Sequence, residues 1–419
     1  MRYDGSKTLL SAVVVCLMAV AAVGCGVRGT PTPGEIDIRT LDVGNYPTEP
    51  LDYRTEYSHD SLFVSRLGMA RLAGAVANGI DIDPDLRHTV QLTGLPDDTG
   101  STAWVLSDAA APVLDRYHLL FGVSVTTSTQ PLEDRVDPYL DASSIRPYLY
   151  GTAPSADATS VNIVVLQFPD EAAARDAATD IEAADFGAAD ANQPVTLDSY
   201  PQAKAHWQPG IPSLGTTVAR GDYVVNIFVQ VPQPDLPTLI ARTRRVLDLQ
   251  LPMLDQLPPL SDRQLLELDY DPDGILRRTL HPDDSELPRF PEESTVTTHG
   301  FLNVTEDVPT WKDLLGRAGV DRVGQVDKTL LFRARDAAAA SALSAGIAAV
   351  VIHRTDAPPG VPDAFCYTQP LSEEGTDYEK VLCAVHYGRY VGIVESEQLE
   401  DAHQQAAAQY ALLAVSAYE

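Results

Sequence analysis

The sequence predicts an α+β fold built from two related βαββα units, each an antiparallel sheet with helices packed on one face. Two observations carry this prediction. In both halves an aspartate suited to a helix N-cap follows a β-rich run, and these two residues, Asp170 and Asp336, are 166 positions apart. Both halves then contain V-x-x-G-x-Y-V around Gly221 and Gly388, which are 167 positions apart, and this agreement indicates an internal duplication.

The first unit begins with a strand over Val161–Phe168, which is rich in β-branched residues. An alanine-rich helix over Glu171–Ala184 follows. Gly221 then suits the positive φ of a two-residue hairpin turn, and a helix over Leu236–Leu249 closes the unit.

The second unit follows the same order. A strand over Thr329–Ala334 precedes a helix over Ala337–Val350, a hairpin turns at Gly388, and a helix over Leu399–Val415 ends the unit. Residues 35–151 have no obvious counterpart in this second half.

Two segments of residues 35–151 are apolar at helical spacing, Leu62–Asn78 and Ala111–Phe121. We expect both to form helices that pack onto the first unit.

The expected domain organisation has four parts. Residues 1–24 form a signal peptide, residues 25–34 a lipidated cysteine and its tether, residues 35–255 an N-terminal α+β domain, and residues 263–419 a C-terminal α+β domain. The proline-containing segment Gln256–Asp262 is the expected hinge between the domains.

The first 25 residues have the layout of an export signal. Arg2 and Lys7 precede an apolar run, Leu9–Gly24, which is marginal in length for a membrane-spanning helix. The tetrapeptide that ends at Cys25 resembles the bacterial lipobox, in which the cysteine receives diacylglycerol before cleavage, although Ala22 stands where leucine is usual. We therefore expect an extracytoplasmic chain anchored to the cell membrane through acyl chains on Cys25, with an ordinary secretory peptide as the alternative.

Beyond Cys25 the exported chain contains two cysteines, Cys366 and Cys383. An even pair in an exported protein favours one disulfide bond, in the C-terminal domain. A free or redox-active pair is the alternative, and the sequence offers no neighbouring cysteine or histidine at the short spacing of a metal site.

Composition limits the classes of partner. The chain has 419 residues and a formal net charge of −29, without a cluster of basic residues. Binding to a phosphate backbone requires such a cluster, so nucleic acid is excluded as an expected partner. No phosphate loop or dinucleotide motif is present, and we expect no cofactor.

One short motif resembles a metal site. Asp269, Asp271 and Asp273 alternate before Gly274, as in the first half of a calcium-binding loop, but Leu280 stands where that loop needs a glutamate. The favoured interpretation is an acidic turn that opens the second domain, with calcium as a weak alternative.

Several motifs together resemble a known family. The lipobox, Leu41–Pro47, Asp81–Pro84, Asp271–Gly274 and the closing segment Cys383–Val391 look like those of actinobacterial envelope lipoproteins of uncharacterised function. The resemblance spans nearly the whole chain and implies a two-domain envelope lipoprotein. It implies no reaction and no catalytic residues.

The sequence therefore favours a non-enzymatic protein that binds an envelope lipid, a small molecule or a protein partner in the groove between its related halves. Its nine histidines show no ligand spacing, and no nucleophile motif is present. Two alternatives remain open, namely a hydrolase whose catalytic site is dispersed along the chain and a structural or interaction protein of the cell wall.

Overall fold

The computed structural model of the chain consists of two compact units, Met1–Thr40 and Leu41–Glu419. In the first unit, the described residues form a short 3₁₀ turn, η1, over Ile38–Thr40. The expected signal peptide, Cys25 and the tether lie outside the described residues. The structure describes residues 36–51, 64–96, 102, 105–131, 155–281, 290–305, 307–370 and 379–417.

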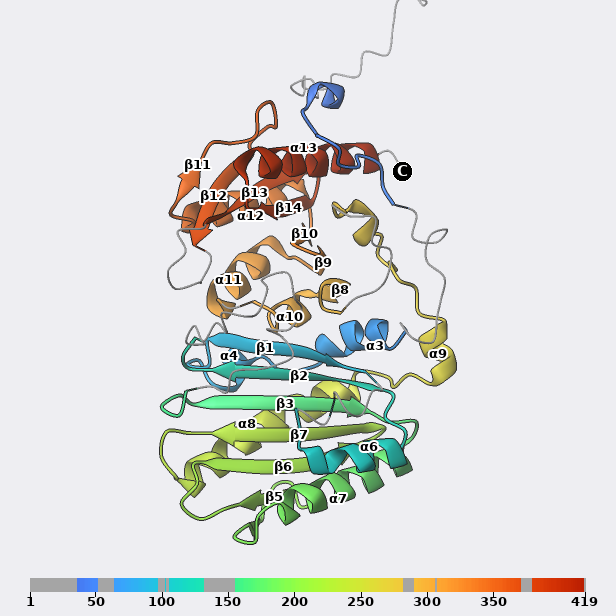
Figure 1. Cartoon of the computed structure of the whole chain (residues 1–419), viewed down its shortest axis with the longest axis vertical. Coiled ribbons are helices and arrows are strands. Elements are labelled where there is room, and N and C mark those ends of the chain that lie inside the picture. Colours follow the sequence, from blue (N-terminus) through green and yellow to red (C-terminus); the bar gives the residue numbers. More distant parts are fainter. Residues whose placement is uncertain are drawn as a thin grey trace, which may run out of the picture. The chain divides into compact units, whose positions relative to one another are not determined.

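The second unit contains two sheets of seven strands, and all neighbouring strands in each sheet are antiparallel (Figure 1). The first sheet contains, in spatial order, β1 (His88–Leu95), β2 (Phe121–Ser128), β3 (Ser160–Gln167), β7 (Tyr223–Gln230), β6 (Ser213–Arg220), β5 (Lys204–Trp207) and β4 (Gln193–Val195). The second contains β8 (Glu293–Thr297), β9 (Arg322–Val326), β10 (Thr329–Arg333), β14 (Tyr390–Ser396), β13 (Glu379–Tyr387), β12 (Phe365–Pro370) and β11 (Arg354–Thr355).

Helices connect the strands of both sheets. Those of the first half are α3 (Val64–Ala73), α4 (Gly79–Ile82), η2 (Asp108–Ala110), α6 (Ala111–Arg116), α7 (Glu171–Gly187), α8 (Leu236–Asp255) and α9 (Asp262–Leu266). Those of the second half are η4 (Leu276–Arg278), α10 (Thr298–Phe301), α11 (Val308–Ala318), α12 (Ala337–Val350) and α13 (Leu399–Ser416). Within the described residues, none of these helices is long and apolar enough to cross a membrane.

The internal duplication is visible in the strand order. The chain runs β3, α7, β4, β5, β6, β7, α8 in the first half and β10, α12, β11, β12, β13, β14, α13 in the second, and equivalent strands occupy equivalent places in the two sheets. The predicted α+β fold with two antiparallel sheets is therefore confirmed.

The duplication extends further than the sequence suggested. β1 and β2, joined through α6, occupy the places that β8 and β9, joined through α10 and α11, occupy in the second sheet. The expectation that residues 35–151 lack a counterpart is therefore wrong. Each half is a larger unit of seven strands, four more than the three strands of the predicted βαββα motif.

The repeated hairpins have the predicted form. β6 and β7 are joined by Gly221 and Asp222, and β13 and β14 by Gly388 and Arg389. Both glycines have φ of +54°, which side chains rarely adopt.

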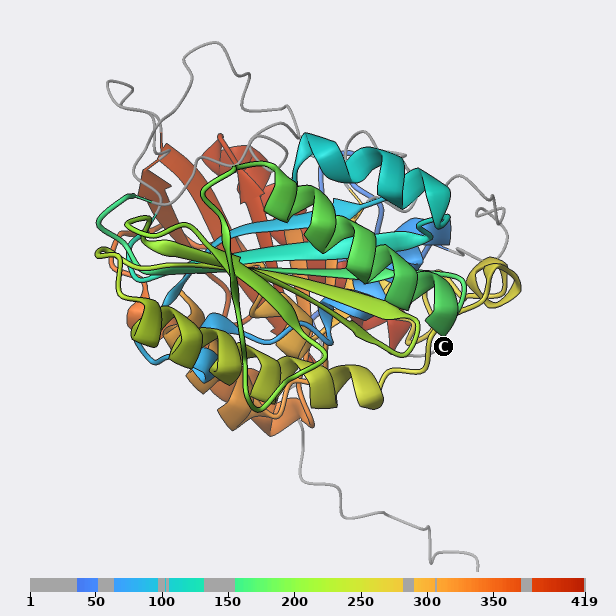
Figure 2. The same ribbon diagram turned by 90° about the horizontal axis from the view of Figure 1, so that it is seen from below.

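Helices cover both faces of the first sheet, whereas the sequence led us to expect one face (Figure 2). Ile163 of β3 belongs to the same buried cluster as Val246 of α8, and its neighbour Val164 belongs to a second cluster with Ile181 of α7. The cause is a central strand that is apolar on both sides and must be covered on both.

The second sheet is arranged in the same way. Phe332 of β10 is buried in one cluster with Leu343 of α12, and the adjacent Leu331 is buried in another with Leu413 of α13. The expectation of helices on one face is therefore wrong for this half too.

Two predicted helices are shorter than expected. The apolar segment Leu62–Asn78 contains α3, which ends at Ala73, and the segment Ala111–Phe121 contains α6, which ends at Arg116. Phe121 is instead the first residue of β2, because its side chain joins the core beneath the sheet.

A disulfide bond joins Cys366 and Cys383, which lie directly opposite each other on β12 and β13. Both residues are fully buried. The bond closes a loop of 17 residues and ties the outer strands of the second sheet to its centre.

The two halves meet around a short buried segment, residues 74–78, between α3 and α4. Gln250 of α8 accepts a hydrogen bond from the Ala77 amide (2.9 Å) and donates one to the Ala75 carbonyl (2.7 Å). From the second half, Asn303 and His299 both donate to the Val76 carbonyl, at 2.9 and 2.8 Å. Because the segment is buried, these side chains supply the partners that water cannot.

Asn78 completes this contact between the halves. Its amide nitrogen donates to Asn303 Oδ1 (2.5 Å) and to the His299 carbonyl (3.2 Å). The segment 74–78 is therefore bonded both to α8 of the first half and to α10 and the following turn of the second.

We expect Gln250→Met to lower the free energy of unfolding by about 3 kcal/mol, because it leaves one amide and one carbonyl of the 74–78 segment buried and unpaired. Urea unfolding followed by circular dichroism measures the change. Gln233→Met, at an exposed position, is the matched control and should alter stability by less than about 0.5 kcal/mol. Equal effects of the two substitutions would contradict the role given to Gln250.

Candidate functional site

A cavity of about 470 Å³ lies where the first half meets the second. Its walls come from α3 and the residues after it, from the end of α8, from residues 268–273, and from β8 and β9. These segments are far apart in the sequence. The volume falls within the range of about 300–1,000 Å³ that is usual for small-molecule sites in proteins.

Apolar atoms form most of the cavity surface, and the polar side chains that share it belong to Arg71, Gln256, Asp269, Asp273, Ser294, Thr295, Thr297 and Arg322. Leu67 and Ala75 contribute from the α3 side, Met253 and Leu257 from the end of α8, and Leu268 from the segment that leads into the second half. A surface of this kind favours an apolar ligand or the apolar part of an amphipathic one.

One charged group in the wall is already neutralised within the protein. Arg322 of β9 forms an ion pair with Asp273, with Nε 2.6 Å from Oδ2. A second arginine, Arg333 of β10, lies 3.5 Å from the other carboxylate oxygen of Asp273. Arg333 also pairs with Asp321 (2.8 Å), so two arginines face two aspartates and this side of the cavity is polar but electrically balanced.

The other cation of the wall is Arg71, in the last turn of α3. Its guanidinium donates a hydrogen bond to the Pro258 carbonyl (2.6 Å) and lies near the hydroxyl of Tyr223. That hydroxyl in turn donates to the Leu257 carbonyl (3.2 Å). Burial raises the pKa of Tyr223 to about 12, and nearby Arg71 opposes this shift, so the phenol is neutral at ordinary pH.

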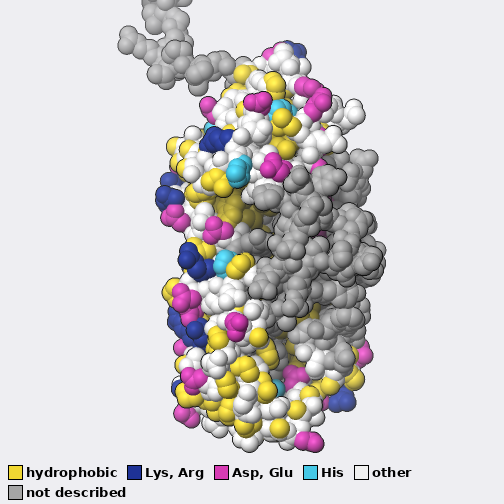
Figure 3. Space-filling view, turned by 60° about the vertical axis from the view of Figure 1, so that its left-hand side comes forward, with side chains coloured by type: hydrophobic (Ala, Val, Ile, Leu, Met, Phe, Trp, Pro, Cys, Tyr) yellow, Lys and Arg dark blue, Asp and Glu magenta, His cyan; other side chains and the backbone are white. Residues whose placement is uncertain are grey.

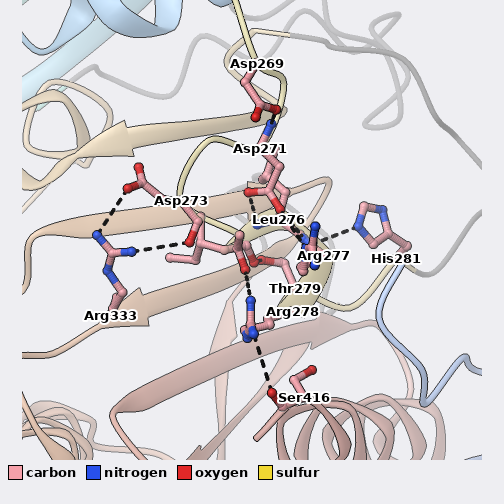
Figure 4. A network of polar contacts seen from close by, with 12 residues as sticks. Asp269, Asp271, Asp273, Leu276, Arg277, Arg278, Thr279, His281, Arg333 and Ser416 are labelled. Atoms are coloured by element: carbon pink, nitrogen blue, oxygen red, sulfur yellow. Dashed lines mark hydrogen bonds and ion pairs between the residues drawn. The ribbon is translucent and has the colours of Figure 1, made fainter. Parts of the chain in front are cut away.

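The acidic motif that the sequence singled out forms a turn beside the cavity (Figure 4). The Asp271 carboxylate is buried and accepts hydrogen bonds from the Leu276 amide (2.9 Å) and the Arg277 amide (3.1 Å). Asp269 accepts a bond from the Asp271 amide (3.1 Å). Burial raises the pKa of Asp271, and these amides oppose that shift.

Arginines bond to the rest of this turn. Gly274, at φ +64°, lets the chain reverse, and its carbonyl accepts a hydrogen bond from Arg278 (2.5 Å). Arg278 also reaches the Ser416 carbonyl of α13 (Figure 4). The carboxylates of Asp271 and Asp273 thus face amides and guanidinium groups, which is the arrangement of a structural turn.

Three residues of types that can ligate a metal, Cys366, Cys383 and His403, lie close together elsewhere in the described part of the chain. The two cysteines are bonded to each other. Thiolate ligation would require the disulfide to be reduced.

Comparison with protein families covers most of the chain. One model, described as "Domain of unknown function (DUF7373) N-terminal", matches residues 57–270, and its C-terminal companion matches residues 275–416. The chain belongs to the DUF7373 family. The two models divide at residues 271–274, which is the acidic turn beside the cavity, so the cavity of this DUF7373 protein lies at the boundary between its family domains.

Similarity to other proteins is more limited. The crystal structure of the extracellular domain of PknH from Mycobacterium tuberculosis is similar to part of this DUF7373 chain, with 12% identity and a TM-score of 0.27. The match covers 47% of this chain and 100% of that one. A comparison with curated proteins finds none that matches.

The hydrolase alternative requires a nucleophile beside a histidine. We therefore consider the pair formed by His206 of β5 and Glu182 of α7. His206 Nδ1 is 2.9 Å from Glu182 Oε1, and this hydrogen bond raises the pKa of His206. The nearby hydroxyl of Ser107 donates to Asp185 (2.7 Å). Among the described residues, the polar partner of the His206 ring is therefore a carboxylate and not a serine.

Figure 3 shows one face of the folded unit, on which apolar side chains gather in the lower part of the view. The larger exposed apolar residues of the first half are Phe186, Ile211, Phe228 and Leu266. Their exposed fractions are 36–44%, and their chemistry alone does not identify a partner.

From the sequence we expected a groove between the halves. Of the residues singled out there, Asp269 and Asp273 line the cavity, although they were considered for calcium and not for this site. Arg71 gave a weak signal, since it is a cation within the apolar segment Leu62–Asn78. The apolar lining residues gave none, because an apolar residue that faces a cavity is indistinguishable in sequence from one that faces the core.

A buried histidine beside the acidic turn predicts acid sensitivity. Burial lowers the pKa of His281 to about 4, from about 6.5 in an unfolded chain. The unfolded state therefore takes up a proton as the pH falls through 6.5, while the folded state stays neutral until about pH 4. Stability should fall over this interval by about 3 kcal/mol on account of His281.

This contribution can be isolated by measuring urea unfolding at about pH 7 and about pH 4.5. His281→Gln should lose less stability between the two pH values than the unmodified protein. His353→Gln, at an exposed position, should keep the original dependence. The assignment would be wrong if the His281 variant were as acid-sensitive as the control.

Proposed function

We propose that this DUF7373 protein is an exported envelope lipoprotein, anchored to the membrane through acyl chains on Cys25, and that its folded unit binds a ligand in the cavity between its halves. The N-terminal sequence supports the anchor, because a cationic start and an apolar run precede the lipobox-like cysteine. The resemblance of several motifs to actinobacterial envelope lipoproteins supports the same location.

The cavity is the observation that carries the binding function. It has a volume of about 470 Å³ and a mainly apolar surface that also carries two arginines and two aspartates, and its walls come from both halves of the duplicated chain. A few polar groups at fixed positions in an otherwise apolar pocket are typical of sites that bind small molecules. The proposal is therefore a binding protein whose ligand contacts both halves.

Two other functions would need different features. A hydrolase needs a nucleophile within reach of a general base, and the described partner of His206 is Glu182. A structural or interaction protein of the cell wall would bind through its outer surface, and its function would not depend on the volume of the cavity.

We predict that Cys25→Ala moves most of the protein from the membrane fraction to the soluble fraction, because the acyl chains are the proposed anchor. Intact mass spectrometry of the unmodified protein should show a chain that begins at Cys25 and carries diacylglycerol. Cys16→Ala is the matched control, since Cys16 lies within the apolar run, and it should stay with the membrane. Membrane retention of the Cys25 variant would count against the anchor.

We also predict that Leu257→Trp removes the ligand that copurifies with the full-length protein, because indole fills volume in the cavity that Leu257 lines. Native mass spectrometry before and after denaturation detects such a ligand. Leu266→Trp makes the same substitution at an exposed position on α9 and should leave the ligand bound. If both variants retain the ligand, the cavity is not its site.

A further inference from the structure

We propose that the ligand of the cavity is an anionic amphiphile, a single-chain lipid-like acid whose carboxylate or phosphate group pairs with Arg71. This inference rests on the proposed function and adds the chemical class of the ligand. It comes from three features of the cavity, namely the contacts of Arg71, the pairing of the second arginine and the apolar character of the wall.

Arg71 is charged but bonds only to neutral groups in the described part of the chain. Its hydrogen-bond partner is the Pro258 carbonyl, and the neutral Tyr223 hydroxyl lies nearby. A guanidinium group has five N–H donors in a planar fork that fits a carboxylate or phosphate. The bond to Pro258 leaves other donors of Arg71 for such an anion and helps to hold the side chain in place.

Acidic residues are abundant in the chain, which contains 59 aspartates and glutamates against 30 lysines and arginines. A scarcity of acids therefore does not explain why Arg71 has no carboxylate partner among the described residues. The other arginine of the wall, Arg322, has Asp273 as its partner at 2.6 Å. Within the described residues, no carboxylate lies at ion-pair distance from Arg71. The two cations of the cavity therefore differ, and Arg71 is the one left for a ligand.

The apolar wall determines the rest of the ligand. Ala75 and Met253, together with Leu257 and Leu268, provide a surface that an alkyl chain covers favourably. A small hydrophilic anion would leave this surface in contact with water. An acid attached to an alkyl chain satisfies the apolar wall and Arg71 at once.

The net charge of −29 argues against attraction of this anion from a distance. At physiological salt, charges beyond about 8 Å are largely screened. The acid group must therefore be held by direct contact with Arg71, so its affinity should depend on that one side chain.

Two probes of equal chain length, dodecanoate and dodecanol, test the inference by isothermal titration calorimetry. The protein is the full chain carrying Cys25→Ala, which removes the proposed acylation site. We expect dodecanoate to bind at least tenfold more tightly than dodecanol. Arg71→Gln should weaken dodecanoate at least tenfold and change dodecanol less than twofold, and Arg71→Lys should retain part of the preference.

Arg317→Gln, at an exposed position on α11, is the control and should change neither affinity. Equal binding of both probes, unaffected by Arg71→Gln, would overturn the assignment of Arg71 but leave a cavity that binds apolar ligands. Failure of both probes to bind the unsubstituted cavity would overturn the proposed function together with this inference. If Leu257→Trp leaves the affinity for the probes unchanged, the probes bind outside the cavity. This result would also overturn the proposed function together with this inference.

Discussion

The fold of the larger unit depends on how the buried segment 74–78 satisfies its backbone. An unpaired buried amide or carbonyl costs about 1–3 kcal/mol, so this segment can be buried only where side chains supply its hydrogen bonds. Gln250 does so from the first half, and Asn303 and His299 do so from the second. Correct pairing therefore requires both halves at once, and it fixes α3, from which Arg71 extends, against the end of α8.

The cavity follows from this contact between two duplicated halves. In each half, helices cover both faces of the sheet. In the first half this is shown by Ile163 and Val164, which belong to separate buried clusters. The halves then meet through α3, β8 and α10 rather than by merging their sheets. Side chains on one helix and one edge strand do not fill the whole junction, and the space that remains is bounded by apolar residues, two arginines, two aspartates and several neutral polar residues.

Short local sequence patterns correctly predicted several strands, helices and turns. The apolar run Val161–Phe168, the N-cap aspartates and the glycines at the hairpin turns correspond to β3, α7, α12 and the two hairpins of the structure. The equivalence of β1 and β8 was missed because these edge strands are polar and share no motif, so only their places in the sheets relate them. Helical spacing continued through Phe121, although packing beneath the sheet makes this residue part of β2. A groove between the halves was expected, but most of the residues that line it could not be predicted, since they come from five separate segments.

The acidic turn at residues 271–274 has a further consequence, since it is both the boundary of the two family domains and a wall of the cavity through Pro272 and Asp273. A molecule that binds only when both walls are in place stabilises their contact by an amount set by its concentration and affinity. Ligand binding in the cavity and the contact between the two halves are therefore thermodynamically linked. Binding strengthens the contact, and a stronger contact raises the affinity for the ligand. A partner that binds the outer surface of both halves would therefore change the affinity of the cavity for its ligand without contacting the cavity.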